Sequence, residues 1–147
     1  MDAQTIRWVL AAHAGATLMM VGLIWTIQLV HYPLFDSVGA EGFARYHAGH
    51  TARISLLVMP LMLAEVMTAV LLLGLQPPQI PTWSLWAGAG LLAVIWGSTF
   101  FLQVPQHGAL SGGFVPEVHR AMVQSNWIRT LAWSARGALV MMWFGSR

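Results

Sequence analysis

Four of the six histidines stand where an apolar stretch begins or ends, and their spacing favours a shared site. His47 and His50 are three positions apart, so on a helix both point to one face. His31 and His107 follow two other apolar stretches and could complete a set of three or four imidazoles. Neutral imidazole binds copper, zinc and iron, so these four side chains predict a transition-metal or haem site. The alternative is that they are interfacial groups bonded to water, lipid headgroups and backbone.

The same parts of the chain carry groups suited to acid–base chemistry. Imidazole is the side chain whose unperturbed pKa lies nearest neutrality, so a histidine here could act as a general base. We therefore predict a catalytic set made of Tyr46, His47, His50 and Asn126.

Arginine and amide side chains near these histidines could hold a substrate. Guanidinium groups recognise carboxylates, phosphates and enolates, and contact with lipid headgroups is the alternative for Arg53, Arg120 and Arg129. Asn126, Arg129 and Trp133 follow i, i+3, i+7 spacing, which is one helix face. The predicted substrate-binding residues are Gln28, Arg53, Gln103, Arg129 and Trp133.

Three ionisable side chains lie deep within apolar stretches. An arginine or aspartate at the centre of a membrane costs roughly 2.5–3.5 kcal/mol on insertion, so each such group needs a partner or a function. Glu65 and Arg136 lie at similar distances from the ends of their stretches. We predict a buried Glu65–Arg136 ion pair with His13 beside it. This group is either a polar clasp that holds the helices together or a proton relay or substrate anchor.

Four apolar stretches must position all of these groups. A hydrocarbon core about 30 Å thick needs about 20 residues of helix, and residues 6–30, 53–75, 83–104 and 118–144 meet that length. We predict an all-α fold with a single domain over residues 1–147, an integral membrane bundle of four helices. Longer connections at 31–51 and 105–117 would lie on one side, and the termini and the proline turn after residue 75 on the other.

Composition supports a membrane protein and excludes several other classes. The chain is 57% hydrophobic and 8% charged, with a mean hydropathy of +0.65, whereas soluble domains carry about a quarter charged residues. A net charge of +2 without a basic run argues against nucleic acid, and the lack of cysteine excludes thiolate metal sites. We expect a multi-pass protein of the cell (inner) membrane whose partners are the lipid bilayer and a hydrophobic small molecule. Self-association into a homo-oligomer stays open.

The arginines predict an orientation. Arg45, Arg53 and Arg120 flank the longer connections, and Arg7 and Arg147 lie near the termini. The positive-inside rule then places the longer connections in the cytoplasm.

The two halves of the chain share a pattern that indicates an internal repeat. Its elements in the first half are Gln28, Pro33, His50 and Arg53, and in the second half Gln103, Pro105, Asn126 and Arg129. We predict repeated helical hairpins over residues 6–75 and 83–144. Because each hairpin holds two spans, both copies face the same way, related by an axis along the membrane normal.

Short motifs in both halves resemble known membrane proteins. Val104-Pro105-x-His107 followed by Asn126-Trp127-Ile128-Arg129-Thr130-x-x-Trp133-x-x-Arg136 resembles the small four-helix membrane proteins grouped with anthrone oxygenases, the DUF1772-like set. His31-Tyr32-Pro33-Leu34-Phe35 and Tyr46-His47-x-x-His50-Thr51-x-Arg53 resemble a set of bacterial hypothetical membrane proteins. The resemblance implies an oxygen-using oxidation of a hydrophobic, phenolic or polycyclic substrate at the membrane. Asn126, Arg129 and Trp133 are the matching positions.

These features together predict a membrane oxidoreductase. It would act on a hydrophobic or amphiphilic substrate at a His/Arg pocket near one membrane face, where the histidines would either bind a transition metal (copper, iron or zinc) or haem, or act as a general base. Two other classes stay open. The internal repeat and the buried His13, Glu65 and Arg136 would suit a small proton-coupled transporter, and a non-catalytic subunit would bind lipid or another membrane protein.

Overall fold

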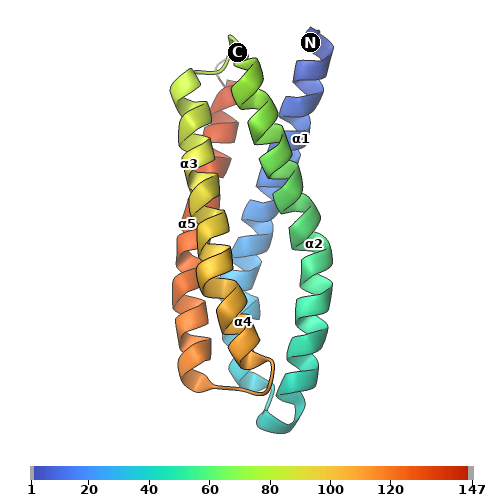
Figure 1. The fold of residues 1–147 in the computed structure, drawn as a ribbon, viewed down its shortest axis with the longest axis vertical. Coiled ribbons are helices and arrows are strands. Elements are labelled where there is room, and N and C mark those ends of the chain that lie inside the picture. Colours follow the sequence, from blue (N-terminus) through green and yellow to red (C-terminus); the bar gives the residue numbers. More distant parts are fainter. Residues whose placement is uncertain (1, 146–147) are drawn as a thin grey trace.

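The chain folds into a bundle of four long helical rods (Figure 1). The computed structural model describes residues 2–145, and within them every regular element is a helix, so the predicted all-α class is confirmed. The elements in chain order are α1 (Ala3–Thr26), η1 (Ile27–His31), η2 (Pro33–Ser37), α2 (Ala40–Leu75), α3 (Thr82–Ser98), η3 (Thr99–Gln103), α4 (Val104–Leu110) and α5 (Pro116–Gly145).

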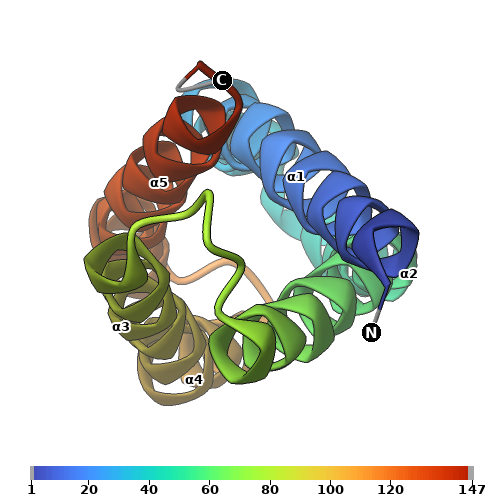
Figure 2. The same ribbon diagram turned by 90° about the horizontal axis from the view of Figure 1, so that it is seen from above.

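The four rods run alternately up and down and stand at the corners of a square (Figure 2). α1 packs against α2 and α5, and α3 packs against α5 and α2. The start of α1, the end of α5 and the α2–α3 turn lie at one end of the bundle, and the other two connections lie at the opposite end (Figure 1). This division of the connections agrees with the sequence prediction.

The predicted connections are themselves largely helical. α2 begins at Ala40, and α3 continues through η3 into α4 as far as Leu110. The predicted spans include only the apolar residues needed to cross the hydrocarbon core, whereas a helix can continue beyond the core through polar residues. Gly39, with a φ of 82°, precedes α2, and Gln76, with a φ of 42°, follows it.

Two π-helical segments sit at corresponding places before a proline. The N–H of Tyr32 donates to the Ile27 carbonyl, five residues back, and the N–H of Val104 donates likewise to Thr99. The next residue in each case is a proline, Pro33 or Pro105. Proline lacks the N–H and its ring clashes with the preceding turn, so a π-type bulge lets each rod continue past it.

The N-terminal helix has a capping residue. The backbone N–H and the hydroxyl of Thr5 both donate to Oδ1 of Asp2 at 2.7 Å. These bonds to the charged form lower the pKa of the Asp2 carboxyl. Arg147, one of the arginines that predict the orientation, lies outside the described residues.

Three of the rods are long and apolar enough to cross a membrane. They are Ala3–Ser37, Ala40–Leu75 and Thr82–Leu110. Only 17% of the most apolar window of Ala40–Leu75 is buried within the bundle, so this rod presents a continuous apolar surface outward. Soluble monomers rarely expose long contiguous apolar surfaces of this kind.

Candidate functional site

Four imidazoles and one phenol converge near the end of the bundle that holds the η2–α2 and α4–α5 connections. His31 Nε2 lies 2.6 Å from His50 Nδ1, and His47 Nε2 lies 2.9 Å from His107 Nδ1. The Tyr32 hydroxyl lies 2.9 Å from His107 Nε2. The rings of His50 and His107 are stacked with centroids 5.8 Å apart, which joins the two pairs. We call these five residues the histidine cluster.

Local structure explains how residues far apart in the sequence meet there. His47 and His50 lie one turn apart on the early part of α2, as their spacing predicts. His31 ends the π-helix η1, and His107 lies on α4, which carries the third rod past its own π-helix. The four histidines lie on helices because the helices continue beyond the apolar stretches.

A buried phenylalanine and a histidine fix the cluster from behind. The Phe35 ring is fully buried and lies 5.1 Å from the His50 ring and 5.4 Å from the His31 ring, centroid to centroid. His119 from α5 bonds through Nε2 to the Tyr32 carbonyl at 2.8 Å. The residues at the start of η2 are therefore tied to a second helix.

Hydrogen-bond chemistry makes part of the cluster a relay. Each nitrogen–nitrogen contact needs one proton, so one ring donates and the other accepts. If the Tyr32 hydroxyl donates to His107 Nε2, then the His107 Nδ1–H donates to His47 Nε2. A proton can thus pass between Tyr32 and His47 through one imidazole. His50 Nε2 is buried and makes no hydrogen bond.

The structure brings together the four predicted metal ligands, as pairs. His31 contacts His50 and His47 contacts His107 through ring nitrogens that would otherwise be free to bind a metal. Within residues 2–145 no group of three or more histidine or acidic side chains has the arrangement of a metal site. A set of ligands made only of imidazoles suits copper, zinc or iron. Within the cluster, His50 Nε2 makes no hydrogen bond and is therefore available as a ligand.

A cavity of about 350 Å³ opens beside the cluster. His31 and His50 form part of its wall, so a molecule in the cavity can touch the cluster. The remaining lining residues are Arg45, Tyr46, Gly49, Arg53, Ile54 and Leu57. Tyr46, predicted as catalytic, is partly exposed at this cavity and its ring lies 6.3 Å from that of His31.

Asn126, also predicted as catalytic, lies in a neighbouring amide network. Its Nδ2 donates to Gln28 Oε1 at 2.9 Å, and its Oδ1 accepts from Arg129 Nη1 at 3.2 Å. Gln28 in turn donates to the Val123 carbonyl at 3.1 Å. Asn126 thus positions two of the predicted substrate-binding side chains and makes no hydrogen bond to the imidazoles.

Arg129 is buried without a carboxylate partner. Its side chain is 5% exposed, its Nε makes no hydrogen bond, and its guanidinium carbon lies 5.2 Å from the centroid of the Trp133 ring. Gln103, by contrast, bonds to Ser125 Oγ at 2.9 Å on α5. The arginines predicted to share one pocket have separate surroundings: Arg53 lines the cavity, Arg120 lines another hollow beside Phe114, and Arg129 is in the core.

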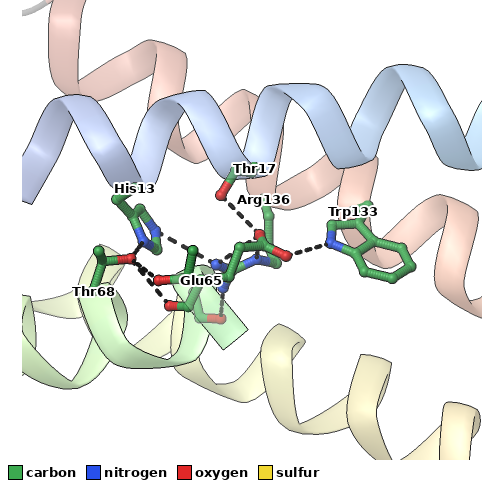
Figure 3. A network of polar contacts seen from close by, with 8 residues as sticks. His13, Thr17, Glu65, Thr68, Trp133 and Arg136 are labelled. Carbon is green, nitrogen blue, oxygen red and sulfur yellow. Dashed lines mark hydrogen bonds and ion pairs between the residues drawn. The ribbon is translucent and has the colours of Figure 1, made fainter. Parts of the chain in front are cut away.

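The predicted Glu65–Arg136 ion pair is present deep in the bundle (Figure 3). Glu65 Oε1 lies 3.2 Å from Arg136 Nη2 and accepts from Thr17 at 2.8 Å. Glu65 Oε2 accepts from Trp133 Nε1 at 2.8 Å. Arg136 also donates to the Gly88 carbonyl, and its Nη2 lies 3.4 Å from Nε2 of His13, as predicted.

The sequence analysis did not identify several residues of the candidate site. Tyr32 was noted only as a helix-end residue, and Arg45 and Gly49 were not placed at a site. Trp133, predicted to contact substrate, connects the ion pair to Arg129, because its indole N–H faces Glu65 and its ring faces the guanidinium. A buried tryptophan usually has a partner for its N–H, and this rule is the signal that could have predicted the bond.

Comparison with protein-family models, with curated proteins and with solved structures found no match to this chain. The function therefore has to be argued from the geometry of the site.

Proposed function

We propose that the chain is an integral membrane protein in which all four rods span the bilayer. Three rods meet the length and hydropathy needed. α5 turns Arg129 and Arg136 into the bundle, while Ile128, Leu131 and Met141 on the same helix are exposed. This is the reverse of a soluble amphipathic helix and suits a helix with lipid outside. A cell (inner) membrane location with the η2–α2 and α4–α5 connections in the cytoplasm is part of this proposal.

We also propose that the two helical hairpins arose by duplication. The support is the matched placement of η1 before Pro33 and η3 before Pro105. The side-chain contacts have diverged, since Gln28 and Gln103 both bond to α5 rather than to equivalent helices.

Within this bundle we propose a membrane oxidoreductase whose working site is the histidine cluster. The observation that carries the proposal is the convergence of four imidazoles and Tyr32 beside a cavity that reaches His31 and His50. A transition metal held by His31, His47, His50 and His107 would supply the redox chemistry. The Tyr32–His107–His47 relay would move protons.

The reaction class follows from the resemblance to anthrone oxygenases and from the apolar surroundings of the site. A methylene group flanked by aromatic rings in a phenolic polycycle reacts with one O₂ to give a ketone and one water. Atoms and electrons balance with dioxygen as the oxidant. Such a substrate dissolves in the bilayer and can reach the cavity from it.

Metal analysis with an optical spectrum tests the proposal. Purified protein, stripped and then reloaded with copper or iron, should bind one of them stoichiometrically, and His47→Ala and His50→Ala should lose it; zinc, which has no redox chemistry, should bind without supporting oxidation. His13→Gln is the control, because it removes an imidazole that lies outside the cluster and makes no contact with it. If reloaded wild-type protein binds none of these metals and shows no haem absorption, the metal-dependent proposal is wrong.

A proton-coupled carrier is the second proposal, and the chain of polar groups along the bundle favours it. The chain runs from His13 through Arg136, Glu65 and Trp133 to Arg129. Proton flux into proteoliposomes under a pH gradient, lost in Glu65→Gln, would support the carrier. Metal binding without flux would support the oxidoreductase.

A further inference from the structure

The lining of the cavity beside the histidine cluster changes from charged to apolar residues along α2. Arg45, Gly49 and Arg53 follow one another at intervals of four residues, so they share one face of the helix. Ile54 and Leu57 continue the lining toward the middle of α2. The distance along the helix from Arg45 to Leu57 is about 18 Å at 1.5 Å per residue. The charged end therefore lies toward the bundle end, and the apolar end toward the centre of the bilayer.

The two arginines at the charged end have no carboxylate partner. Among residues 2–145 the ion pair is the one between Glu65 and Arg136. The Arg53 side chain makes one long hydrogen bond, 3.4 Å from Nη1 to the Gly49 carbonyl oxygen one turn back on its own helix. Both arginines line one cavity, so an anion bound there would be attracted by two positive charges.

Gly49 lets the Arg53 guanidinium lie close against the helix backbone beside the cavity. A methyl group added at Gly49 would lie 3.0 Å from Arg53 Nη1. Any larger residue there would displace the guanidinium and fill the space between the two arginines. The cavity, at about 350 Å³, falls within the range of roughly 300–1,000 Å³ found for small-molecule sites.

We infer that this cavity binds an anionic amphiphile, with its carboxylate or phosphate between Arg45 and Arg53 and its apolar part along Ile54 and Leu57. Guanidinium groups bind both anions through paired, charge-assisted hydrogen bonds. The inference rests on the proposed function in one respect: it makes this amphiphile the substrate class, because a molecule anchored there lies against His31 and His50. The binding site itself does not depend on a metal.

A spin-labelled stearic acid is the probe for this site. The protein is placed in nanodiscs of phosphatidylcholine at alkaline pH, where the carboxyl group is ionised, and the immobilised fraction of the label is measured by electron paramagnetic resonance. The uncharged methyl ester is the ligand control. A second set of nanodiscs contains phosphatidylglycerol, whose headgroup competes if the natural occupant is a lipid.

The acid should bind at least about tenfold more tightly than its methyl ester, as expected for charge-assisted bonds. Arg45→Gln with Arg53→Gln should remove that difference, and Gly49→Leu should weaken both ligands. Arg120→Gln is the matched control: it removes an arginine from the same end of the bundle that lines a different hollow, and should change nothing. Strong competition by phosphatidylglycerol would identify a lipid as the occupant, and weak competition a free amphiphile.

Equal binding of acid and ester, or an equal effect of Arg120→Gln and the double variant, would overturn the inference. Metal content measured on the same samples separates this result from the proposed function. Arg45→Gln with Arg53→Gln should keep the wild-type metal content, whereas His50→Ala should lose metal. If the protein binds no metal but still binds the acid selectively, the anion site is supported and the metal-dependent oxidoreductase proposal is wrong.

Discussion

Replacing Glu65 by glutamine is the sharpest test of how the bundle is held together. The glutamine keeps the shape of the side chain but removes its charge. In the wild type, Oε1 of Glu65 faces Arg136 and Thr17, and Oε2 faces the indole N–H of Trp133. The new amide NH₂ would meet at least one of these three donors, donor against donor, and the Arg136 guanidinium would stay buried without an anion.

The expected cost can be worked from the geometry. At the 3.2 Å separation of the pair, Coulomb's law gives about 5 kcal/mol for an effective dielectric constant near 20. Removing one partner of a buried ion pair costs about 3–5 kcal/mol in proteins, mainly because the other charge is left without compensation. We expect Glu65→Gln to lower the free energy of unfolding by an amount in that range. Glu65 is 0% and Arg136 2% exposed, so solvent screening does not reduce it.

Reversible unfolding in mixed micelles, followed by circular dichroism, measures the effect. Glu65→Leu combined with Arg136→Met should recover most of the lost stability, because replacing both charges by apolar groups removes the uncompensated one. Glu41→Gln, at an exposed position early in α2, is the charge-matched control and should change stability by less than about 0.5 kcal/mol. A loss below about 1 kcal/mol for Glu65→Gln would refute the reasoning.

Two further predictions concern packing and the amide network. Asn126→Ala should lower stability by about 1–3 kcal/mol in the same assay, since it leaves Gln28 Oε1 and Arg129 Nη1 short of a partner; a change as small as that of Gln124→Ala, an exposed neighbour on α5, would contradict this. Gly137→Val should cost about 1–3 kcal/mol, because even a methyl group there would lie 3.0 Å from Val21 Cγ2. Gly15→Val, with nothing within 4 Å, is its control, and equal losses would show that close α1–α5 packing is not the cause.

Helix faces were predictable because they depend on local periodicity alone. His47 and His50 share a face of α2, and Asn126 with Arg129 shares a face of α5, as their spacing requires. The Glu65–Arg136 pair could be predicted from depth, since two opposite charges in an apolar bundle have few other partners. These successes need no knowledge of how one helix is rotated against another.

The cavity and the relay were beyond prediction because they depend on such rotations. The Tyr32–His107 bond forms only if η1 and α4 are both offset by their π-helical turns. Arg45 and Gly49 become lining residues only because α2 starts at Ala40, a boundary that the apolar length could not reveal. The sequence alignment of the two halves pairs Gln28 with Gln103. The structure pairs η1 with η3 and Pro33 with Pro105, which is a different register.

The buried ion pair around Glu65 and the amide network around Arg129, which the sequence analysis treated as separate sites, are connected in the structure. Trp133 bonds to Glu65 on one side and lies under Arg129 on the other, so the groups form one structure. The buried charged residues that the structure describes are two arginines and one glutamate, apart from histidines, which leaves one positive charge uncompensated. That charge is Arg129, which acts electrostatically on His107. Because a metal ion at the imidazoles would add further positive charge, the loaded site would favour an anionic ligand, the class of molecule that we propose Arg45 and Arg53 to bind at the adjoining cavity.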